Sequence, residues 1–422
     1  MSEKKDFLND KILIIGKVWP EPDSSAAGTR MMELVDFFRS YGANVTFATA
    51  AAESKYAVDL EAKGVETAQI KLNHSSFDTF VFGLDPSLVL FDRFMTEEQF
   101  GWRVAEQCPK AIRVLDTEDL HCLRSARQQA WKKGAEFKES DVLNDVAKRE
   151  VASILRCDLS LMISSYEMYL LKEVFGVDES LILHLPFMLK RLGADELNKW
   201  LAYDKRKHFI TIGNFLHEPN WNAVLYLKEK IWPLIHTELP GTELHVYGAY
   251  ASPKVEQLHN EKQGFIVKGR AENAMEVVGN ARVLLAPIRF GAGLKGKLIE
   301  AMLCGTPSIT TSVGAEAMSG ELPWPGQVED DPELFARAAI HAYKNPEYWE
   351  DLRNNGPQII DSMYSKEMLS IGLKERINCL KDNLQLHRQQ NFIGSILQHH
   401  MMLSTRYMSK WIETKNSNGQ VI

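Results

Sequence analysis

Short apolar runs alternate with amphipathic segments along most of the chain, and this alternation limits the accessible folds more than any other feature. In the first half, the runs that predict buried strands are residues 11–16, 44–49, 87–91, 111–115 and 159–163. Helices are expected between them, the first over about 28–40 with Met32, Val35 and Phe38 on one face. Because strands separated by helices pair in parallel, this half is expected to form an α/β domain around a parallel sheet.

The alternation stops at residues 188–207, which lack a strand signal, and then begins again. The second set of predicted strands covers residues 209–213, 244–247, 282–286 and 307–310, with helices over about 220–236 and 295–304. The simplest organisation is an N-terminal domain over 1–187, a linker over 188–207 and a second α/β domain over 208–365. A cleft between two such domains is a favoured place for a ligand.

Residues 366–422 are expected to form a helical tail. From residue 384 to 415, the apolar side chains recur on one helical face. Two interpretations remain open. In the first, which we favour, the tail packs this face back on the N-terminal domain. In the second, the face lies on the inner surface of a membrane, since basic residues accompany it. Those residues are Arg388, Arg406, Lys410 and Lys415.

Composition excludes several classes of protein. The chain of 422 residues has a formal charge of −7, which makes it a poor general binder of nucleic acid. Its five cysteines are scattered without a Cys-x-x-Cys pair, so neither a disulfide framework nor a zinc–thiolate site is expected, and a cytoplasmic location fits best. No leader-like apolar segment follows Met1, and no apolar run is long enough to cross a membrane. No Asp-x-Asp pair or histidine–carboxylate cluster indicates a metal site.

The strongest functional signal lies where the strand over 282–286 runs through a glycine-rich loop, residues 291–296, into a helix. The backbone N–H groups of such a loop and the N-terminus of a helix bind anions. Lys295 and Lys297 stand at this helix end, where the helix dipole disfavours cations, so they indicate a bound anion. Glu300, one turn further on, is suited to accept hydrogen bonds from sugar hydroxyls. Together these groups predict a nucleotide site.

Two other interpretations of this loop remain. Read literally, Gly291 to Gly296 is a G-x-G-x-x-G match with Glu316 at a distance suited to a ribose contact, which is the pattern of a dinucleotide site. Against it, the match does not follow the first strand of its domain, and Pro287 to Phe290 separate the strand from the first glycine. The glycines could also serve only as a corner between strand and helix.

The run Gly291–Pro307, followed by Ser312–Glu316, resembles the retaining glycosyltransferases of group 1 (family 4). The segments Thr211–Ala223 and Pro20–Arg30 are similar to earlier parts of the same family, so the resemblance covers about residues 10–360. It implies the GT-B fold, in which two Rossmann-like domains face each other across a cleft, here with a C-terminal helical tail. It also implies transfer of a sugar from a nucleotide diphosphate sugar to an acceptor hydroxyl, with retention of configuration and without a metal or other cofactor.

The resemblance assigns donor binding to residues of both domains. Glu300 matches the second glutamate of the family's Glu-x7-Glu motif, which binds the ribose, whereas Ala292 replaces the first glutamate. Contacts with the donor sugar are therefore expected from the loop backbone, and Lys295, with Arg289 or Lys297, is expected to neutralise the diphosphate. The full set of expected donor-binding residues is Gly28, Asn214, Arg270, Arg289, Gly291, Ala292, Gly293, Leu294, Lys295, Lys297 and Glu300.

Catalytic residues are expected from residues 116–121, which follow a predicted strand and resemble the part of the family that carries a His or Asp beside the transferred sugar. The candidates are His121 and Asp119, together with Lys295. Structural roles compete with these assignments. His121 could lie in the core or cap a helix, and Asp119 could be an N-cap residue. In the same way, Arg30 could form a structural salt bridge.

Other functions share this architecture. The chain could be a sugar-nucleotide epimerase or a phosphorylase, or a catalytically silent partner subunit, to which the alanine at position 292 points. The acceptor is open among a glycan, a lipid-linked molecule, a protein and an RNA, and the oligomeric state is open too. A basic cluster could bind an anionic acceptor, although a solvated helix face is the simpler interpretation. Its residues are Arg124, Arg127, Lys132 and Lys133.

Overall fold

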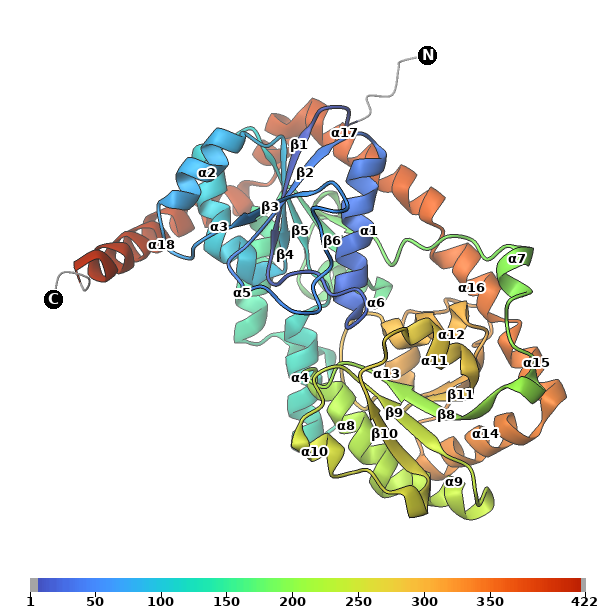
Figure 1. Ribbon diagram of the computed structural model, residues 1–422. Coiled ribbons are helices and arrows are strands. Elements are labelled where there is room, and N and C mark those ends of the chain that lie inside the picture. The colour runs from blue at the N-terminus through green and yellow to red at the C-terminus, as the bar shows by residue number, and fades with distance from the viewer. Residues whose placement is uncertain (1–6, 419–422) are drawn as a thin grey trace.

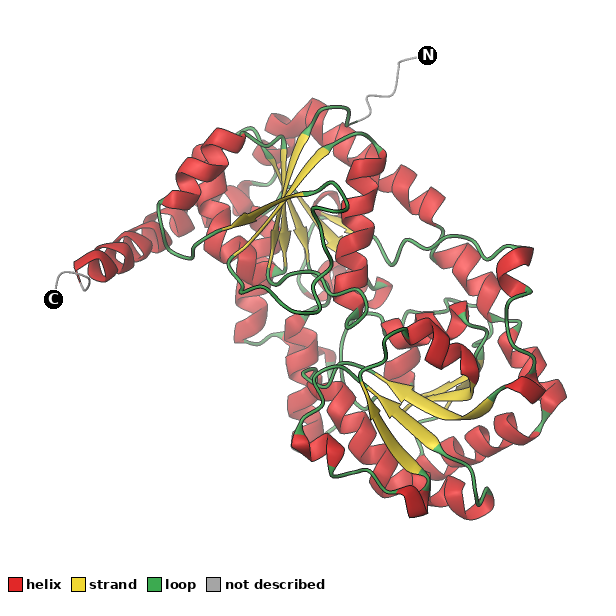
Figure 2. Cartoon of the chain, viewed as in Figure 1, coloured by secondary structure: helices red, strands yellow, loops and turns green. Residues whose placement is uncertain are grey.

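The computed structural model describes residues 7–418 and shows two α/β domains and a helical tail (Figure 1). Residues 1–6 and 419–422 lie outside the described residues, and with them the start of the chain on which the leader prediction rests. In each domain, helices pack around a central parallel sheet (Figure 2). All five cysteines are free, as their spacing predicts. In the described chain, no helix is both long and apolar enough to cross a membrane.

The N-terminal sheet, within the described residues, has seven parallel strands in the order β3-β2-β1-β4-β5-β6-β7. Their bounds are β1 Lys11–Gly16, β2 Asn44–Thr49, β3 Glu66–Gln69, β4 Leu88–Asp92, β5 Ile112–Asp116, β6 Leu159–Met162 and β7 Ile182–His184. The helices are α1 Ala26–Ser40, α2 Ser76–Leu84, α3 Phe94–Gln107, α4 His121–Lys132, α5 Asp145–Arg156 and α6 Ser165–Tyr169. Helix α1 buries Met32, Val35 and Phe38, the face that its periodicity predicts.

The C-terminal sheet has six parallel strands over the described part of the chain, in the order β10-β9-β8-β11-β12-β13. Their bounds are β8 Lys207–Ile212, β9 Leu244–Tyr247, β10 Phe265–Gly269, β11 Ala281–Ala286, β12 Ser308–Thr310 and β13 Gly326–Val328. The helices are α8 Glu218–Tyr226, α9 Trp232–Glu238, α10 Pro253–Glu256, α11 Ala274–Asn280, α12 Gly296–Leu303, α13 Ser312–Ala315, α14 Pro332–Lys344, α15 Pro346–Arg353 and α16 Gly356–Met363.

Every strand predicted from an apolar run is present, with ends that differ by at most two residues. The short strands β3, β7 and β13 were not predicted: β3 and β13 contain no apolar run, and β7 has only three residues. The helix expected over 220–236 is divided into α8 and α9 by a π-helical turn, Leu227–Ile231. Such turns are inserted into otherwise regular helices.

Both sheets have the strand order that creates a ligand crevice. β4 lies on the other side of β1 from β2, and β11 lies on the other side of β8 from β9. Ligands bind beyond the carboxyl ends of the strands at such a point, where the direction of winding reverses. The loops that follow β1, β4, β8 and β11 line one cavity between the domains. This confirms the predicted fold, two Rossmann-like domains facing across a cleft, with a helical tail.

The chain crosses between the domains twice, side by side. In the first crossing the Leu189 N–H donates to the Tyr364 carbonyl at 2.7 Å, and in the second the Lys366 N–H donates to the Leu189 carbonyl at 2.8 Å. The first crossing, predicted as a linker without a strand signal, contains a short helix, α7 Ala194–Leu197. After the second crossing, α17 (Lys366–Gln390) returns to the N-terminal domain and buries apolar side chains in its core.

The tail is two helices rather than one. Helix α17 ends at Gln390, and α18 covers Phe392–Asn418. In Figure 1, α18 runs out past the N-terminal domain to the C-terminus. Both helices pack on the N-terminal domain, but α18 does not do so through its apolar face, because Phe392 and Trp411 are 68% and 63% exposed. The polar side of α18 contacts the N-terminal domain instead.

Candidate functional site

A cavity of about 620 Å³ lies between the two domains. The N-terminal domain lines it with residues that follow β1, β4 and β5, and the C-terminal domain with residues that follow β8, β10 and β11. With one exception, Arg289, every site residue predicted from the sequence lines this cavity. The structure therefore brings the two predicted groups, those from 116–121 and those from the glycine-rich loop, to one place.

The glycine-rich loop is docked on the N-terminal domain. The Gly293 N–H donates to Glu167 Oε1 at 2.8 Å, and the same oxygen accepts the Leu120 N–H at 3.1 Å. Gly293 has φ +64°, and a Cβ at this position would lie 2.9 Å from the Cβ of Asp119. A side chain at position 293 would thus both strain the backbone and separate the domains.

Lys295 and Lys297 place two partly buried cations at the start of α12. Lys295 Nζ donates to the Gly293 carbonyl at 2.7 Å, and Lys297 Nζ donates to Asn220 Oδ1 at 2.9 Å. Burial lowers the pKa of each ammonium to about 8, although nearby carboxylates partly oppose the shift. Both hydrogen-bond acceptors are neutral oxygens, so the positive charge is available to an anion in the cavity.

Glu300 lies one turn further along α12 and lines the same cavity. Burial raises the pKa of its carboxyl above the ordinary value, and Lys297 partly offsets the rise. The structure thus preserves the arrangement expected for a nucleotide, with cations at the helix start and a hydroxyl acceptor one turn away.

Asn214 and Arg270 lie on the C-terminal side of the cavity, and both reach the loop after β1. Arg270 Nε donates to Ser24 Oγ at 3.3 Å, and its guanidinium lies 4.4 Å from the centre of the Tyr56 ring. Asn214 Nδ2 donates to the Ser24 carbonyl at 3.5 Å. These two residues therefore contact the N-terminal domain as well as the cavity.

The structure gives Gly28 a different role from the expected one. Its N–H donates to Ser25 Oγ at 3.1 Å, which caps α1, so it is not directed to a phosphate. A Cβ at this position would lie 2.4 Å from the Glu21 carbonyl oxygen. The glycine is required because the chain folds back closely on the start of α1.

Arg289 corrects the prediction that it neutralises the diphosphate. Its guanidinium lies 4.9 Å from the centre of the Trp131 ring and 4.1 Å from that of Tyr226, and Nε donates to Asn222 Oδ1 at 2.8 Å. It lines a second, smaller pocket, whereas its chain neighbours Ile288 and Phe290 line the main cavity. The Arg289 side chain is therefore directed away from the main cavity.

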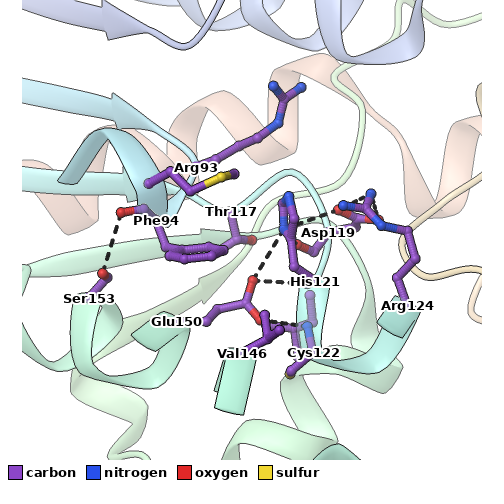
Figure 3. A network of polar contacts seen from close by, with 12 residues as sticks. Arg93, Phe94, Thr117, Asp119, His121, Cys122, Arg124, Val146, Glu150 and Ser153 are labelled. Atoms are coloured by element: carbon purple, nitrogen blue, oxygen red, sulfur yellow. Dashed lines mark hydrogen bonds and ion pairs between the residues drawn. The ribbon is translucent and has the colours of Figure 1, made fainter. Parts of the chain in front are cut away.

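His121 and Asp119 are held in a polar network at the start of α4 (Figure 3). His121 Nδ1 lies 3.1 Å from the Asp119 carbonyl and 3.4 Å from Glu150 Oε1. Asp119 Oδ2 accepts from Arg124 Nη1 at 2.7 Å, and this pair with His121 outweighs burial and lowers the pKa of Asp119. The N-cap of α4 is Leu120, so Asp119 does not have the capping role that the sequence leaves open.

The two arginines of the proposed basic cluster on α4 are engaged in ion pairs. Arg124 pairs with Asp119, and Arg127 is buried against Glu316 of the C-terminal domain. Lys132 and Lys133 are exposed, as expected of a solvated helix face. The arginines are therefore not free to bind an anionic acceptor, and Glu316 is occupied rather than directed to a ribose. Arg30 likewise forms the structural salt bridge, with Asp116.

Three residues at or beside the cavity were not predicted. Arg93 and Glu118, which follow β4 and β5, have φ of +70° and +63°, an uncommon conformation for residues other than glycine. Burial and the nearby Asp116 raise the pKa of Glu118 to about 8. Glu167, which holds the glycine-rich loop, follows β6. Position after a strand end is the signal that could have identified all three.

The described residues contain no group of three or more His, Cys, Asp or Glu side chains arranged to hold a metal ion.

Comparison with known proteins identifies the C-terminal domain. The family model "Glycosyl transferases group 1" matches residues 206–345. A relative from Klebsiella pneumoniae, named "Uncharacterized 44.6 kDa protein in cps region", is 24% identical over 176 residues. That match covers 39% of this chain and 45% of the relative, so it spans less than half of either protein.

Solved structures share the complete two-domain fold. Sucrose-phosphate synthase from Thermosynechococcus elongatus has a TM-score of 0.63 at 16% identity, covering 88% of this chain and 99% of that one. TarM, solved from S. aureus, has a TM-score of 0.67 at 9% identity over 88% and 99%. Anabaena HepE, solved with UDP and glucose, has a TM-score of 0.62 at 12% identity over 88% and 100%. The family match over residues 206–345 supports the resemblance to group 1 glycosyltransferases seen in the sequence, and the solved structures show that the chain as a whole has the GT-B fold.

Proposed function

We propose that the protein transfers a sugar from a nucleoside diphosphate sugar to an acceptor hydroxyl. One observation carries this proposal: Lys295, Lys297 and Glu300 stand together at the start of α12, facing the cavity between the domains. Two cations suit the diphosphate and the carboxylate suits the ribose. Anabaena HepE was solved in complex with UDP-glucose, which supports a uridine nucleotide as the first donor to test.

The two lysines supply the positive charge that this reaction requires beside the leaving group. When the glycosidic bond breaks, the departing nucleoside diphosphate gains negative charge, and fixed cations beside it stabilise the transition state. Lys295 and Lys297 are buried at the start of α12, and this burial lowers their pKa to about 8. Because they can provide this charge, we propose that the reaction needs no metal ion, and treatment with a chelator is expected to leave the rate unchanged.

Retention of configuration is also part of the proposal, with the acceptor attacking the face from which the leaving group departs. His121 and Asp119 lie on the N-terminal side of the cavity, opposite α12, where they would contact the transferred sugar. Ala292 is buried against the N-terminal core and supplies no carboxylate, so the backbone of residues 291–294 would hold the donor sugar.

Calorimetric titration with UDP, followed by incubation with a UDP-sugar, tests the proposal. We expect saturable UDP binding that is lost in Glu300→Ala and weakened in Lys295→Ala, and sugar transfer when an extract supplies acceptors. An isomerised donor without any acceptor would indicate an epimerase instead. Nucleotide binding without transfer, together with tight association with an active glycosyltransferase, would indicate a silent partner subunit. Failure to bind any nucleoside diphosphate would refute the site itself.

A further inference from the structure

Helix α18 packs on the N-terminal domain through its polar side. Arg103 Nη2 donates to Ser409 Oγ at 2.8 Å, and Arg113 Nη1 donates to Gln398 Oε1 at 3.1 Å. Near the end of the helix, Glu413 Oε1 accepts the Ser75 N–H at 3.0 Å. These contacts lie along most of the helix, so they fix which side of α18 faces the domain.

Close backbone packing supports the same orientation. Gly394 is buried, and a Cβ there would lie 2.1 Å from the Leu155 carbonyl oxygen of α5. Asn391, just before α18, donates from Nδ2 to that carbonyl at 2.7 Å. The side of α18 that meets the domain is therefore made of small and polar residues.

The opposite side of α18 is an apolar stripe exposed to solvent. Its members follow helical spacing and are Phe392, Ile396, Leu403, Tyr407 and Trp411, with exposed fractions of 68%, 39%, 48%, 68% and 63%. At 1.5 Å per residue, the stripe is about 29 Å long. A soluble amphipathic helix normally buries its apolar side, and an exposed apolar surface of this kind marks a binding site for another molecule or a membrane.

We propose that this stripe docks α18 on an anionic lipid surface. Aromatic residues, here Phe392, Tyr407 and Trp411, are the side chains that favour the boundary between lipid headgroups and acyl chains. A single exposed helix with an apolar side and flanking lysines is the form in which proteins lie in the plane of that boundary. Lys410 and Lys415 are exposed beside the stripe.

The charge on α18 favours lipid over a second copy of the chain. Arg406 is paired with Glu106 of the domain, and Glu413, the one carboxylate in the sequence of α18, is turned to Ser75. The exposed charges beside the stripe are therefore both positive. A second copy paired in parallel would bring these lysines against their equivalents, whereas an anionic surface would be attracted to them.

Vesicle flotation of the full chain tests this proposal and does not depend on the proposed reaction. We expect binding to phosphatidylcholine vesicles that contain about 30 mol% phosphatidylglycerol, and much weaker binding to phosphatidylcholine alone. Raising the salt from about 0.1 M to about 1 M should weaken the binding, because it shortens the screening length from about 10 Å to about 3 Å.

Two variants with a matched control locate the contact. Trp411→Ser combined with Leu403→Ser should lower the vesicle partition coefficient by about tenfold or more, since two apolar side chains no longer enter the lipid. The control is Leu334→Ser, because Leu334 of α14 is 47% exposed and Leu403 is 48% exposed. Lys410→Glu with Lys415→Glu should abolish the preference for anionic vesicles.

Three results would overturn the proposal. The first is that the protein binds neither kind of vesicle. The second is that the double variant of Trp411 and Leu403 binds vesicles as well as the unsubstituted protein does. The third is that sedimentation shows a concentration-dependent dimer that the double variant does not form. The last result would assign the stripe to contact between two copies of the chain. Unchanged melting temperatures of all variants would show that the effects do not come from unfolding.

Discussion

Arg127 of α4 and Glu316, which follows α13, form a bidentate ion pair between the two domains. The two hydrogen bonds are 2.5 Å from Nη2 to Oε1 and 2.9 Å from Nη1 to Oε2. Arg127 Nη1 also donates to the Gly291 carbonyl at 3.0 Å. The Arg127 side chain of the N-terminal domain thereby holds both the glycine-rich loop and the segment after β12, next to the cavity.

Replacing Arg127 with alanine is expected to weaken the closed arrangement of the domains, because it leaves the Glu316 carboxylate without its partner at the interface. UDP affinity should fall by at least about tenfold, as is typical when one member of a buried charge pair is removed. Small-angle scattering should show a larger radius of gyration for Arg127→Ala with UDP present.

The pair between Arg149 and Glu98 provides a matched control, since it also joins an arginine to a glutamate but lies within one domain, with Arg149 57% exposed. Exposed ion pairs contribute little, so Arg149→Ala should leave UDP affinity and scattering unchanged. Equal effects of the two substitutions would contradict a specific role for the pair between the domains.

The lysines at α12 predict a pH dependence of donor binding. In the free protein, burial lowers the pKa of Lys295 and Lys297 to about 8. A bound diphosphate favours the charged ammonium and raises these pKa values, so binding takes up protons where the free lysines are neutral. The contribution of the two lysines to UDP affinity should therefore be constant below about pH 7 and be lost above about pH 8.

Titration calorimetry at several pH values, in buffers of different ionisation enthalpy, measures both the affinity and the proton uptake. Lys297→Arg should reduce the fall above pH 8, because a guanidinium stays charged throughout this range. An affinity that rises with pH would show that the lysines are not the groups that bind the diphosphate.

The sequence predicted the sheets and the glycine-rich loop at the start of a helix because both depend on local patterns. A buried strand needs an apolar run, as in β1 and β11, and an anion site needs glycines and cations at a helix start, as around Lys295. Contacts between distant segments carry no such pattern. Nothing near Arg127 indicates Glu316, and nothing near Gly293 indicates that Glu167 will hold it.

The sequence also did not indicate in which direction individual side chains point in the folded protein. The spacing of Phe392, Tyr407 and Trp411 predicts an apolar side of a helix, but not which side meets the domain; that is decided by Arg103 and Arg113, which belong to distant elements. In the same way, the residues around Arg289 suggest a cation near the diphosphate, whereas contacts with Trp131, Tyr226 and Asn222 hold it in another pocket.

Glu300 is expected to act through the ribose. Glu300→Gln removes the charge but keeps one carbonyl acceptor, and Glu300→Ala removes both acceptors. UDP affinity should fall about tenfold or more in the alanine variant and less in the glutamine variant, in line with loss of hydrogen bonds to a charged group. The 2′,3′-dideoxy analogue of UDP, which lacks the hydroxyls, should bind all three proteins with similar affinity. If Glu300→Ala lowered the affinity for the dideoxy analogue as much as the affinity for UDP, Glu300 would contact another part of the nucleotide.

Glu167 is expected to make the stability of the protein depend on pH. It is fully buried, and this burial, with Asp119 and Glu150 nearby, raises its pKa to about 8, although two backbone N–H donors oppose the rise. In the unfolded chain the pKa is near the ordinary value of about 4.3, so between these values the folded state holds more protons. The contribution of the protonated Glu167 side chain to the free energy of unfolding is therefore fully present below the lower pKa, and it is lost as the pH rises through about 8.

Glu167→Gln mimics the protonated side chain and keeps an acceptor for the N–H groups of Leu120 and Gly293. Thermal unfolding at about pH 5 and about pH 8.5 should show that the Tm of the variant relative to the natural protein is higher at the upper pH. Glu347→Gln, at an exposed position of α15, should show no such difference. Glu167→Ala removes the acceptor and should also weaken UDP binding, because the loop of residues 291–294 loses its support. If Glu167→Gln shifted the Tm equally at both pH values, Glu167 would be ionised in the folded protein at both.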